Sequence, residues 1–235
     1  MQAQAIAYIG FAGSLNVGEV DLPIAICKES ILLGGNYQCV FGRMINIGEN
    51  VAKSETGGWT DFNQDSCVAN PGTVESLVGS GNPEVITYGK GMAIYREGGG
   101  MQSAFNNLRE SWEDATNQNE LWNRTLPVVS CPDDGCGEMV GAVNVNIVWI
   151  TGAEDDPSYS DAPSEMGDWS YQDPNGETRW NVFVANFALE DNDGGPAPYK
   201  KESIYFVPDC VDHVPKGGTG EENVGVLAKV PVLVD

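Results

Sequence analysis

The sequence is poor in basic residues. Its 235 residues include 12 lysines and arginines against 34 aspartates and glutamates, so the formal net charge is −22. A surface this negative repels the phosphate backbone of nucleic acids and the headgroups of anionic lipids. We therefore expect no nucleic-acid partner and no direct binding to a membrane surface. A solvated acidic surface is the simplest interpretation, and divalent-cation binding is the alternative.

Residues and motifs that support catalysis are also scarce. His213 is the only histidine, so any serine–histidine or cysteine–histidine mechanism would depend on it alone. Its position between Cys210 and Pro215 is typical of a loop. The sequence has no G-x-S-x-G, H-E-x-x-H or S-x-x-K motif, and the glycines at 98–100 lack the other residues of a phosphate-binding loop. We expect the protein not to be an enzyme.

Closely paired cysteines of the kind that bind zinc are absent, although the sequence has six cysteines. Their even number favours three disulfides and an oxidising compartment. The six are Cys27, Cys39, Cys67, Cys131, Cys136 and Cys210. Turn-forming residues between Cys131 and Cys136 make these two the pair that the spacing favours. Cys27–Cys39 and Cys67–Cys210 would complete the set, among the many pairings that six cysteines allow.

Long apolar runs are missing as well. No uninterrupted apolar stretch is long enough to span a membrane, and residues 1–13 lack the basic region of a signal peptide. The cysteine content is typical of an exported protein, but no export signal is visible. The sequence therefore predicts that the chain is a fragment of a longer protein. We expect its leading segment to lie upstream of Met1.

Glycine and proline are abundant, with 29 and 13 residues, and they divide the sequence into short segments that mostly resemble strands. Alternation or β-branched content predicts strands at 5–11, 22–27, 37–47, 126–130, 139–150, 180–189, 203–207 and 224–234. In the segment 139–150, Val143, Val145 and Ile147 alternate with Asn144 and Asn146. Residues 57–71 are predicted to be loop with local turns.

One segment is typical of an amphipathic helix. Apolar residues recur at helical spacing through 101–117, at Met101, Phe105, Leu108, Trp112 and Ala115. Strands that do not alternate with helices favour an antiparallel or mixed sheet. The sequence therefore predicts a single α+β domain over 1–235, with one main helix packed on a mostly antiparallel or mixed β-sheet.

Two acidic segments, 153–178 and 190–202, separate the late strands and contain candidate calcium ligands. Asp155 and Asp156 lie in the first, and Asp191 and Asp193 lie in the second. Calcium binds carboxylate and carbonyl oxygens on loops, although the glycine after Asp193 comes too early for an EF-hand. Solvated turns are the alternative interpretation. No other metal and no organic cofactor is predicted.

Six tryptophans raise the question of a sugar-binding face. Periodicity places Trp112 and Trp149 in the core, whereas Trp122 and Trp169 are the two that we expect to be exposed. Exposed tryptophans beside the acidic segments would favour a calcium-dependent adhesin-like or carbohydrate-binding surface domain. A secreted hydrolase that uses two carboxylates is a further alternative.

Several runs of the sequence, taken in order, resemble the ectodomain of TadG-like proteins from the Tad/Flp pilus-assembly system. The runs are residues 4–13, 22–27 and 58–62, the predicted helix at 101–117, and residues 126–131, 140–150 and 229–235. The resemblance implies an extracytoplasmic domain, in the periplasm or at the cell surface, anchored by an N-terminal membrane helix that precedes this chain. It also implies a minor pilin-like or assembly component with pilins or secretion proteins as partners, and it supplies no catalytic residues. The acidic segments have no counterpart in this pattern.

Overall fold

The computed structural model describes most of the chain. The described residues are 6–11, 13–33, 36–37, 42–46, 57–95, 101–131, 136–152, 162–167, 169–171, 178–190, 195–212 and 229–234. For a few of them, including residues 6–11 and 229–234, only the backbone is described. None of the described helices is long and apolar enough to cross a membrane.

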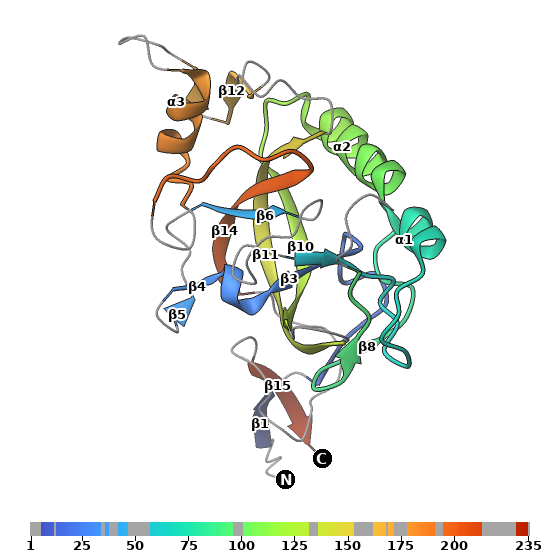
Figure 1. Cartoon of the computed structure of the whole chain (residues 1–235). Coiled ribbons are helices and arrows are strands. Elements are labelled where there is room, and N and C mark those ends of the chain that lie inside the picture. The colour runs from blue at the N-terminus through green and yellow to red at the C-terminus, as the bar shows by residue number, and fades with distance from the viewer. Residues whose placement is uncertain are drawn as a thin grey trace.

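A seven-stranded mixed sheet forms the centre of the molecule (Figure 1). The strand order is β6, β14, β11, β10, β3 and β7, and β9 pairs with the start of β11. The strands are β3 (Ile24–Cys27), β6 (Arg43–Asn46), β7 (Gly57–Trp59), β9 (Gly91–Met92), β10 (Trp122–Ser130), β11 (Gly137–Thr151) and β14 (Ser203–Asp212). Only β10 and β3 pair in parallel, and the other neighbours in this sheet are antiparallel. The α+β prediction with a mixed sheet is confirmed.

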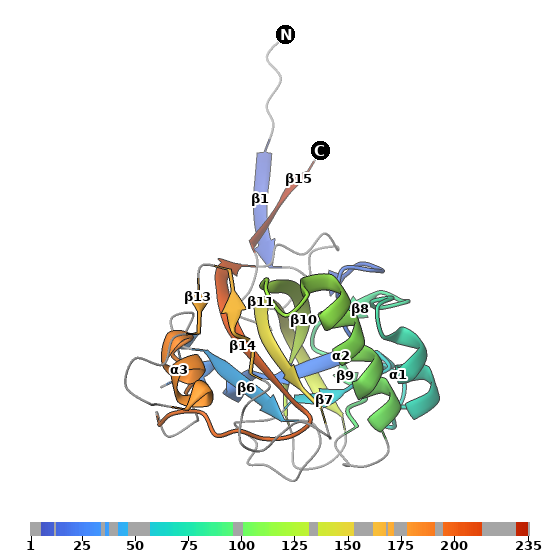
Figure 2. The same cartoon turned by 90° about the horizontal axis from the view of Figure 1, so that it is seen from above.

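In the described ranges, four small two-stranded sheets accompany the central one. They pair β1 (Ile6–Phe11) with β15 (Lys229–Val234), β2 (Ser14–Leu15) with β8 (Ile86–Thr87), β4 (Leu32–Leu33) with β5 (Asn36–Tyr37), and β12 (Glu165–Met166) with β13 (Trp169–Ser170). A short 3-10 helix, η1 (Lys28–Ser30), follows β3. Figure 2 shows β1 and β15 side by side, extending away from the rest of the molecule.

Strand β11 is an inner strand of the sheet, since β10 pairs along one of its edges and β14 along the other. Its alternation matches the sequence prediction, because Val143, Val145 and Ile147 are almost completely buried. Asn144 and Asn146 are half-buried on the other face. Side chains of β10 bond to both: the hydroxyl of Thr125 donates to Asn144 and the amide of Asn123 donates to Asn146, each at 2.9 Å.

The predicted helix is present as α2 (Gln102–Thr116) and covers one flank of the sheet. Phe105, Leu108 and Trp112 are buried on its core side, as the apolar stripe predicts. The prediction for Ala115 was wrong, because Ala115 is exposed and Thr116 takes the buried position. The Thr116 hydroxyl donates to the carbonyl of Trp112 at 2.7 Å, which satisfies its polar group inside the core.

The predicted strand over 180–189 is a helix instead, α3 (Arg179–Asn186). Its β-branched and aromatic residues favour a strand by composition, but Trp180, Phe183 and Val184 are buried at helical spacing. Thr178 caps the helix, since its hydroxyl accepts a hydrogen bond from the N–H of Asn181 at 3.4 Å. The spacing of the large apolar side chains therefore outweighed strand propensity.

The segment 57–71, predicted to be loop, contains regular structure at both ends. Strand β7 occupies its start, and α1 (Pro71–Leu77) begins where it ends. The side chain of Asn70 caps α1 by accepting from the N–H of Thr73 at 3.2 Å, and proline at the first helical position suits the helix start. Between the two elements the chain forms a structured loop, residues 60–70.

The tryptophans lie mostly in the core. Trp112 and Trp149 are buried, as predicted, and Trp149 contacts the rings of Trp180, Phe183, Tyr199 and Tyr205 at centroid distances of 5.7–6.1 Å. Trp122 was expected to be exposed, but it is only 7% exposed and the guanidinium of Arg124 covers its ring at 4.1 Å. Trp169 is half-buried and packs on α3. Aromatic packing thus accounts for side chains that the sequence suggested for sugar binding.

Candidate functional site

Within the described part of the chain, two disulfides are present, Cys27–Cys131 and Cys67–Cys136. The predicted pairs Cys131–Cys136, Cys27–Cys39 and Cys67–Cys210 are therefore wrong. Cys27 ends β3, which pairs in parallel with β10 beside Cys131, and this pairing brings the two Cα atoms to 5.2 Å. Cys39 and the side chain of Cys210 lie outside the described residues.

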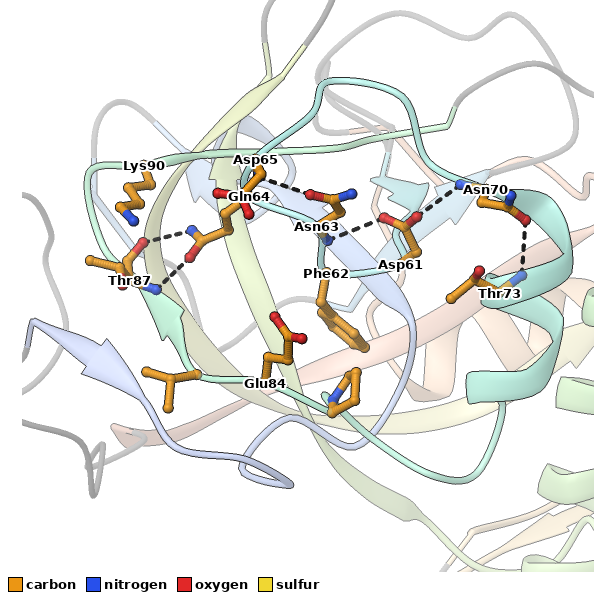
Figure 3. A pocket seen from close by; sticks show the side chains of 12 residues that line it. Asp61, Phe62, Asn63, Gln64, Asp65, Asn70, Thr73, Glu84, Thr87 and Lys90 are labelled. Carbon is orange, nitrogen blue, oxygen red and sulfur yellow. Dashed lines mark hydrogen bonds between the residues drawn. The ribbon is translucent and has the colours of Figure 1, made fainter.

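A groove of about 600 Å³ lies between the loop 60–70, the start of α1 and the segment 83–90 (Figure 3). Three carboxylates line it, from Asp61, Asp65 and Glu84, and Lys90 is the one basic residue among its lining residues. Phe62 lies between Asp61 and Glu84 in Figure 3, with its ring almost completely buried. The groove is thus predominantly polar, with an excess of negative charge.

The loop 60–70 is shaped by its own side chains, which replace missing backbone pairing. The carboxylate of Asp61 accepts from the N–H groups of Asn63 at 3.1 Å and of Asn70 at 2.9 Å, which closes the loop. The side-chain oxygen of Asn63 accepts from the N–H groups of Asp65 at 2.8 Å and of Ser66 at 3.2 Å. These are the local turn motifs that aspartate and asparagine favour.

Two further contacts hold this loop against the rest of the domain. The side-chain amide of Gln64 makes two hydrogen bonds to the backbone of Thr87, which joins the two walls of the groove. The N–H of Ala93 donates to the carbonyl oxygen of Asn63 at 2.9 Å. Phe62 has a positive φ of 60°, which is uncommon for a residue with a side chain, and its ring is almost completely buried. The buried ring holds the backbone in this conformation.

The opposite wall depends on the buried side chain of Asn82. Its oxygen accepts from the N–H of Val20 at 2.9 Å, and its amide donates to the carbonyl oxygens of Asn16 at 2.8 Å and Glu84 at 2.7 Å. Gly81 precedes it with a φ of +71°, and a side chain there would collide with the carbonyl of Val20. This network fixes the chain that leads into the groove.

The arrangement of charges suits a partner with positive charge. Both oxygens of Asp61 accept backbone hydrogen bonds, whereas no hydrogen bond to the carboxylates of Asp65 and Glu84 is made within the described residues. Both of these residues are exposed. Carboxylates at the rim of an open groove favour association with basic groups through electrostatic complementarity.

The other sequence-predicted site residues lie outside the described part of the chain. These are the calcium candidates Asp155, Asp156, Asp191 and Asp193, together with His213 and the glycines at 98–100. Among the residues that the structure describes, no group of three or more histidine, cysteine, aspartate and glutamate side chains is arranged to hold a metal. Calcium binding at these aspartates therefore stays a prediction.

The groove has only a partial signal in the sequence. Asp61, Asn63 and Asn70 are turn-forming residues, and asparagine before proline is typical of a helix start. The link between Gln64 and Thr87 spans 23 residues and has no local signature. The chain was therefore recognisable as a loop but not as the wall of a groove.

Comparison with known proteins returns no relative. No family model matches the chain, and neither does any curated protein or solved structure. The features that bear on function are therefore the disulfides, the groove and the sequence resemblance.

Proposed function

We propose that this chain is the extracytoplasmic interaction domain of a Tad/Flp-type pilus-assembly protein, similar to the TadG-like proteins. It acts through protein–protein contacts with pilins or with other assembly and secretion proteins, and not through catalysis. The membrane anchor that the resemblance implies would belong to another part of the full-length protein. The observation that carries the proposal is a disulfide-linked fold with an open acidic groove on its surface.

The disulfides support a location in an oxidising, extracytoplasmic compartment. Both link segments far apart in the sequence, with separations of 104 and 69 residues, and such bonds persist in oxidising environments. They restrict the unfolded chain, which suits a domain that must remain folded outside the cell. An extracytoplasmic location agrees with the resemblance to a pilus-assembly ectodomain.

The groove supports an interaction role. Its walls are fixed in advance by side-chain hydrogen bonds, so a partner need not order them on binding. Val85 lies at its edge and is 51% exposed, so an apolar contact is available beside the carboxylates. An exposed apolar residue next to polar groups is typical of a protein-binding surface.

The carbohydrate-binding alternative has lost the feature that would have favoured it. Exposed tryptophans beside the acidic segments would favour it, but Trp122 is buried and Trp169 packs on Phe183 and Phe187. No described observation favours a hydrolase.

The proposal is tested by photo-crosslinking in a strain that assembles the pilus. A photo-reactive amino acid replaces Val85 in the full-length protein, and the matched control replaces Leu121, which is 45% exposed after α2 and does not line the groove. We expect the Val85 variant to crosslink to a pilin or to a pilus-assembly protein identified by mass spectrometry. The Leu121 variant is expected to give little or no such product.

Two results would count against the proposal. One is crosslinking to pilus proteins at neither position, or equally at both. The other is a deletion strain that lacks the protein yet assembles filaments in normal number. The photo-reactive variants should secrete and fold normally, because both replaced side chains are exposed.

A further inference from the structure

The two disulfides lie in different environments. Cys27 is completely buried and Cys131 is 9% exposed, and both belong to an apolar cluster with Val129 and Met139. Cys67 is exposed and Cys136 is half-buried. Thiol–disulfide exchange requires a thiolate to reach a sulfur, so only the second bond is accessible to a reductant while the domain is folded.

The two bonds also differ in what else holds the segments that they join. Next to Cys27–Cys131, strands β3 and β10 already pair through their backbones. The loop tip at residues 65–68 is exposed throughout, and Val68 is 76% exposed. Within the described residues, the tip is held by local turn bonds and by the link from Cys67 to Cys136. Among the described residues, that disulfide is therefore the one side-chain covalent link between the tip and the sheet.

Cys136 is itself firmly placed. It comes directly before β11, where Gly137 and Glu138 pair with Met92 and Gly91 of β9. A side chain at Gly91 would lie 2.8 Å from the Cβ atom of Cys136, so the two segments approach closely. Breaking the bond would leave Cys136 in position and release the loop tip with Cys67.

We propose that Cys67–Cys136 is a site of thiol–disulfide exchange with a dithiol, and that its reduction releases the loop tip at residues 65–68, which forms part of the groove wall. A thiolate of the dithiol attacks the sulfur of Cys67, forms a mixed disulfide and expels Cys136 as a thiolate. The second thiolate of the dithiol attacks the dithiol sulfur bonded to Cys67 and expels Cys67 as a thiolate. Two electrons pass to the protein, the dithiol becomes a disulfide, and its two protons pass to the released thiolates or to water.

The consequence for the groove rests on the proposed function, whereas the exchange site does not. Asp65 lines the groove and belongs to the released tip. Gln64 keeps its bonds to Thr87, so the inner part of the loop stays in place. Reduction would thus move the Asp65 carboxylate and leave the bonds between Gln64 and Thr87 in place. Partner binding would then depend on whether Cys67–Cys136 is oxidised or reduced.

The exchange site is tested on the full chain with dithiothreitol under native conditions. Samples are quenched with an alkylating agent over time, and labelled cysteines are identified by peptide mass spectrometry. We expect Cys67 and Cys136 to be labelled at least about tenfold faster than Cys27 and Cys131, because of their different access. In denaturant the two rates should converge. Equal rates under native conditions, or earlier labelling of Cys27 and Cys131, would overturn the assignment.

The release of the loop tip is tested by hydrogen exchange on the selectively reduced protein. Amides of residues 65–68 should exchange faster, while those of β10 and β11 keep their protection. A double variant, Cys67→Ser with Cys136→Ser, should reproduce this pattern without reductant. Unchanged exchange at 65–68, or faster exchange throughout the sheet, would refute the local release of the tip. Neither measurement needs a partner, so their outcome is independent of the Val85 crosslinking.

Discussion

The side-chain amide of Gln64 pairs with the backbone of Thr87 as a neighbouring strand would. Its nitrogen donates to the Thr87 carbonyl oxygen at 2.7 Å, and its oxygen accepts from the Thr87 N–H at 2.7 Å. One side chain thereby satisfies two backbone groups at the end of the small sheet that β8 forms with β2. It also joins two segments that line the groove.

Replacing this amide should weaken the domain locally. Gln64→Ala leaves both backbone groups of Thr87 without these partners, and we expect the free energy of unfolding to fall by about 1–2 kcal/mol. Urea denaturation followed by tryptophan fluorescence measures the change. Gln118→Ala is the control, because Gln118 is exposed and its amide makes one long bond to Glu113 at 3.2 Å. Equal effects of the two substitutions would contradict the role of Gln64.

A second prediction concerns the buried amide of Asn82. Asn82→Asp keeps the size of the side chain but removes the donor that serves the carbonyl oxygens of Asn16 and Glu84. A carboxylate facing two carbonyl oxygens in a buried site should lower the free energy of unfolding by about 3 kcal/mol or more. Asn106→Asp on the exposed side of α2 is the matched control and should change stability little. A small effect at position 82 would show that the network does not hold this wall.

Close packing of β7 gives a third prediction. A Cβ atom at Gly57 would collide with the carbonyl oxygen of Ala25 and lie 2.7 Å from a methyl group of Ile45. Gly57→Ala should therefore cost about 1–3 kcal/mol through overpacking. Gly72→Ala in α1 meets no close contact and should be neutral or stabilising by up to about 1 kcal/mol, since alanine favours helix. In thermal denaturation, the melting temperature should fall for Gly57→Ala and should stay the same or rise for Gly72→Ala.

The buried side chain of Tyr88 should make the stability of the domain depend on pH in the alkaline range. Burial, with a smaller contribution from the carboxylate of Glu19, raises the pKa of Tyr88 above its ordinary value. Between the unfolded and the folded pKa, the unfolded chain has lost this proton and the folded chain retains it. Stability is therefore unaffected by this group below about pH 10 and decreases as the pH rises further.

The substitution Tyr88→Phe isolates this contribution. The buried hydroxyl has no hydrogen-bond partner among the described residues, so its removal should cost little at neutral pH. Above about pH 10 the variant should lose stability less steeply than the wild type, as measured by urea denaturation across a pH series. Parallel curves for the two proteins would argue against a buried Tyr88.

The sequence predicted the elements whose signal is local. An apolar stripe at helical spacing predicted the helix α2. The alternation of Val143, Val145 and Ile147 with asparagines predicted the strand β11. The helix α3 was missed because tryptophan, phenylalanine and valine favour strands by composition. Their spacing, with Trp180, Phe183 and Val184 on one side, carried the correct signal.

Contacts between residues far apart in the sequence could not be predicted from local patterns. The cysteine pairing depends on β3 and β10 lying side by side, and nothing near Cys131 in the sequence shows that pairing. A short loop between Cys131 and Cys136 permits a bond, but the sheet places a different partner next to each. The groove likewise depends on Gln64 meeting Thr87 and on Asn82 meeting Val20, contacts that a local pattern does not encode.

The most direct test of an exported, disulfide-linked interaction domain is a non-reducing peptide map of the protein recovered from outside the cytoplasm. Mass spectrometry should find linked peptides that contain Cys27 with Cys131 and Cys67 with Cys136. A linked Cys131–Cys136 peptide would contradict the fold. Six free thiols would contradict the oxidising compartment and, with it, the proposed role in pilus assembly.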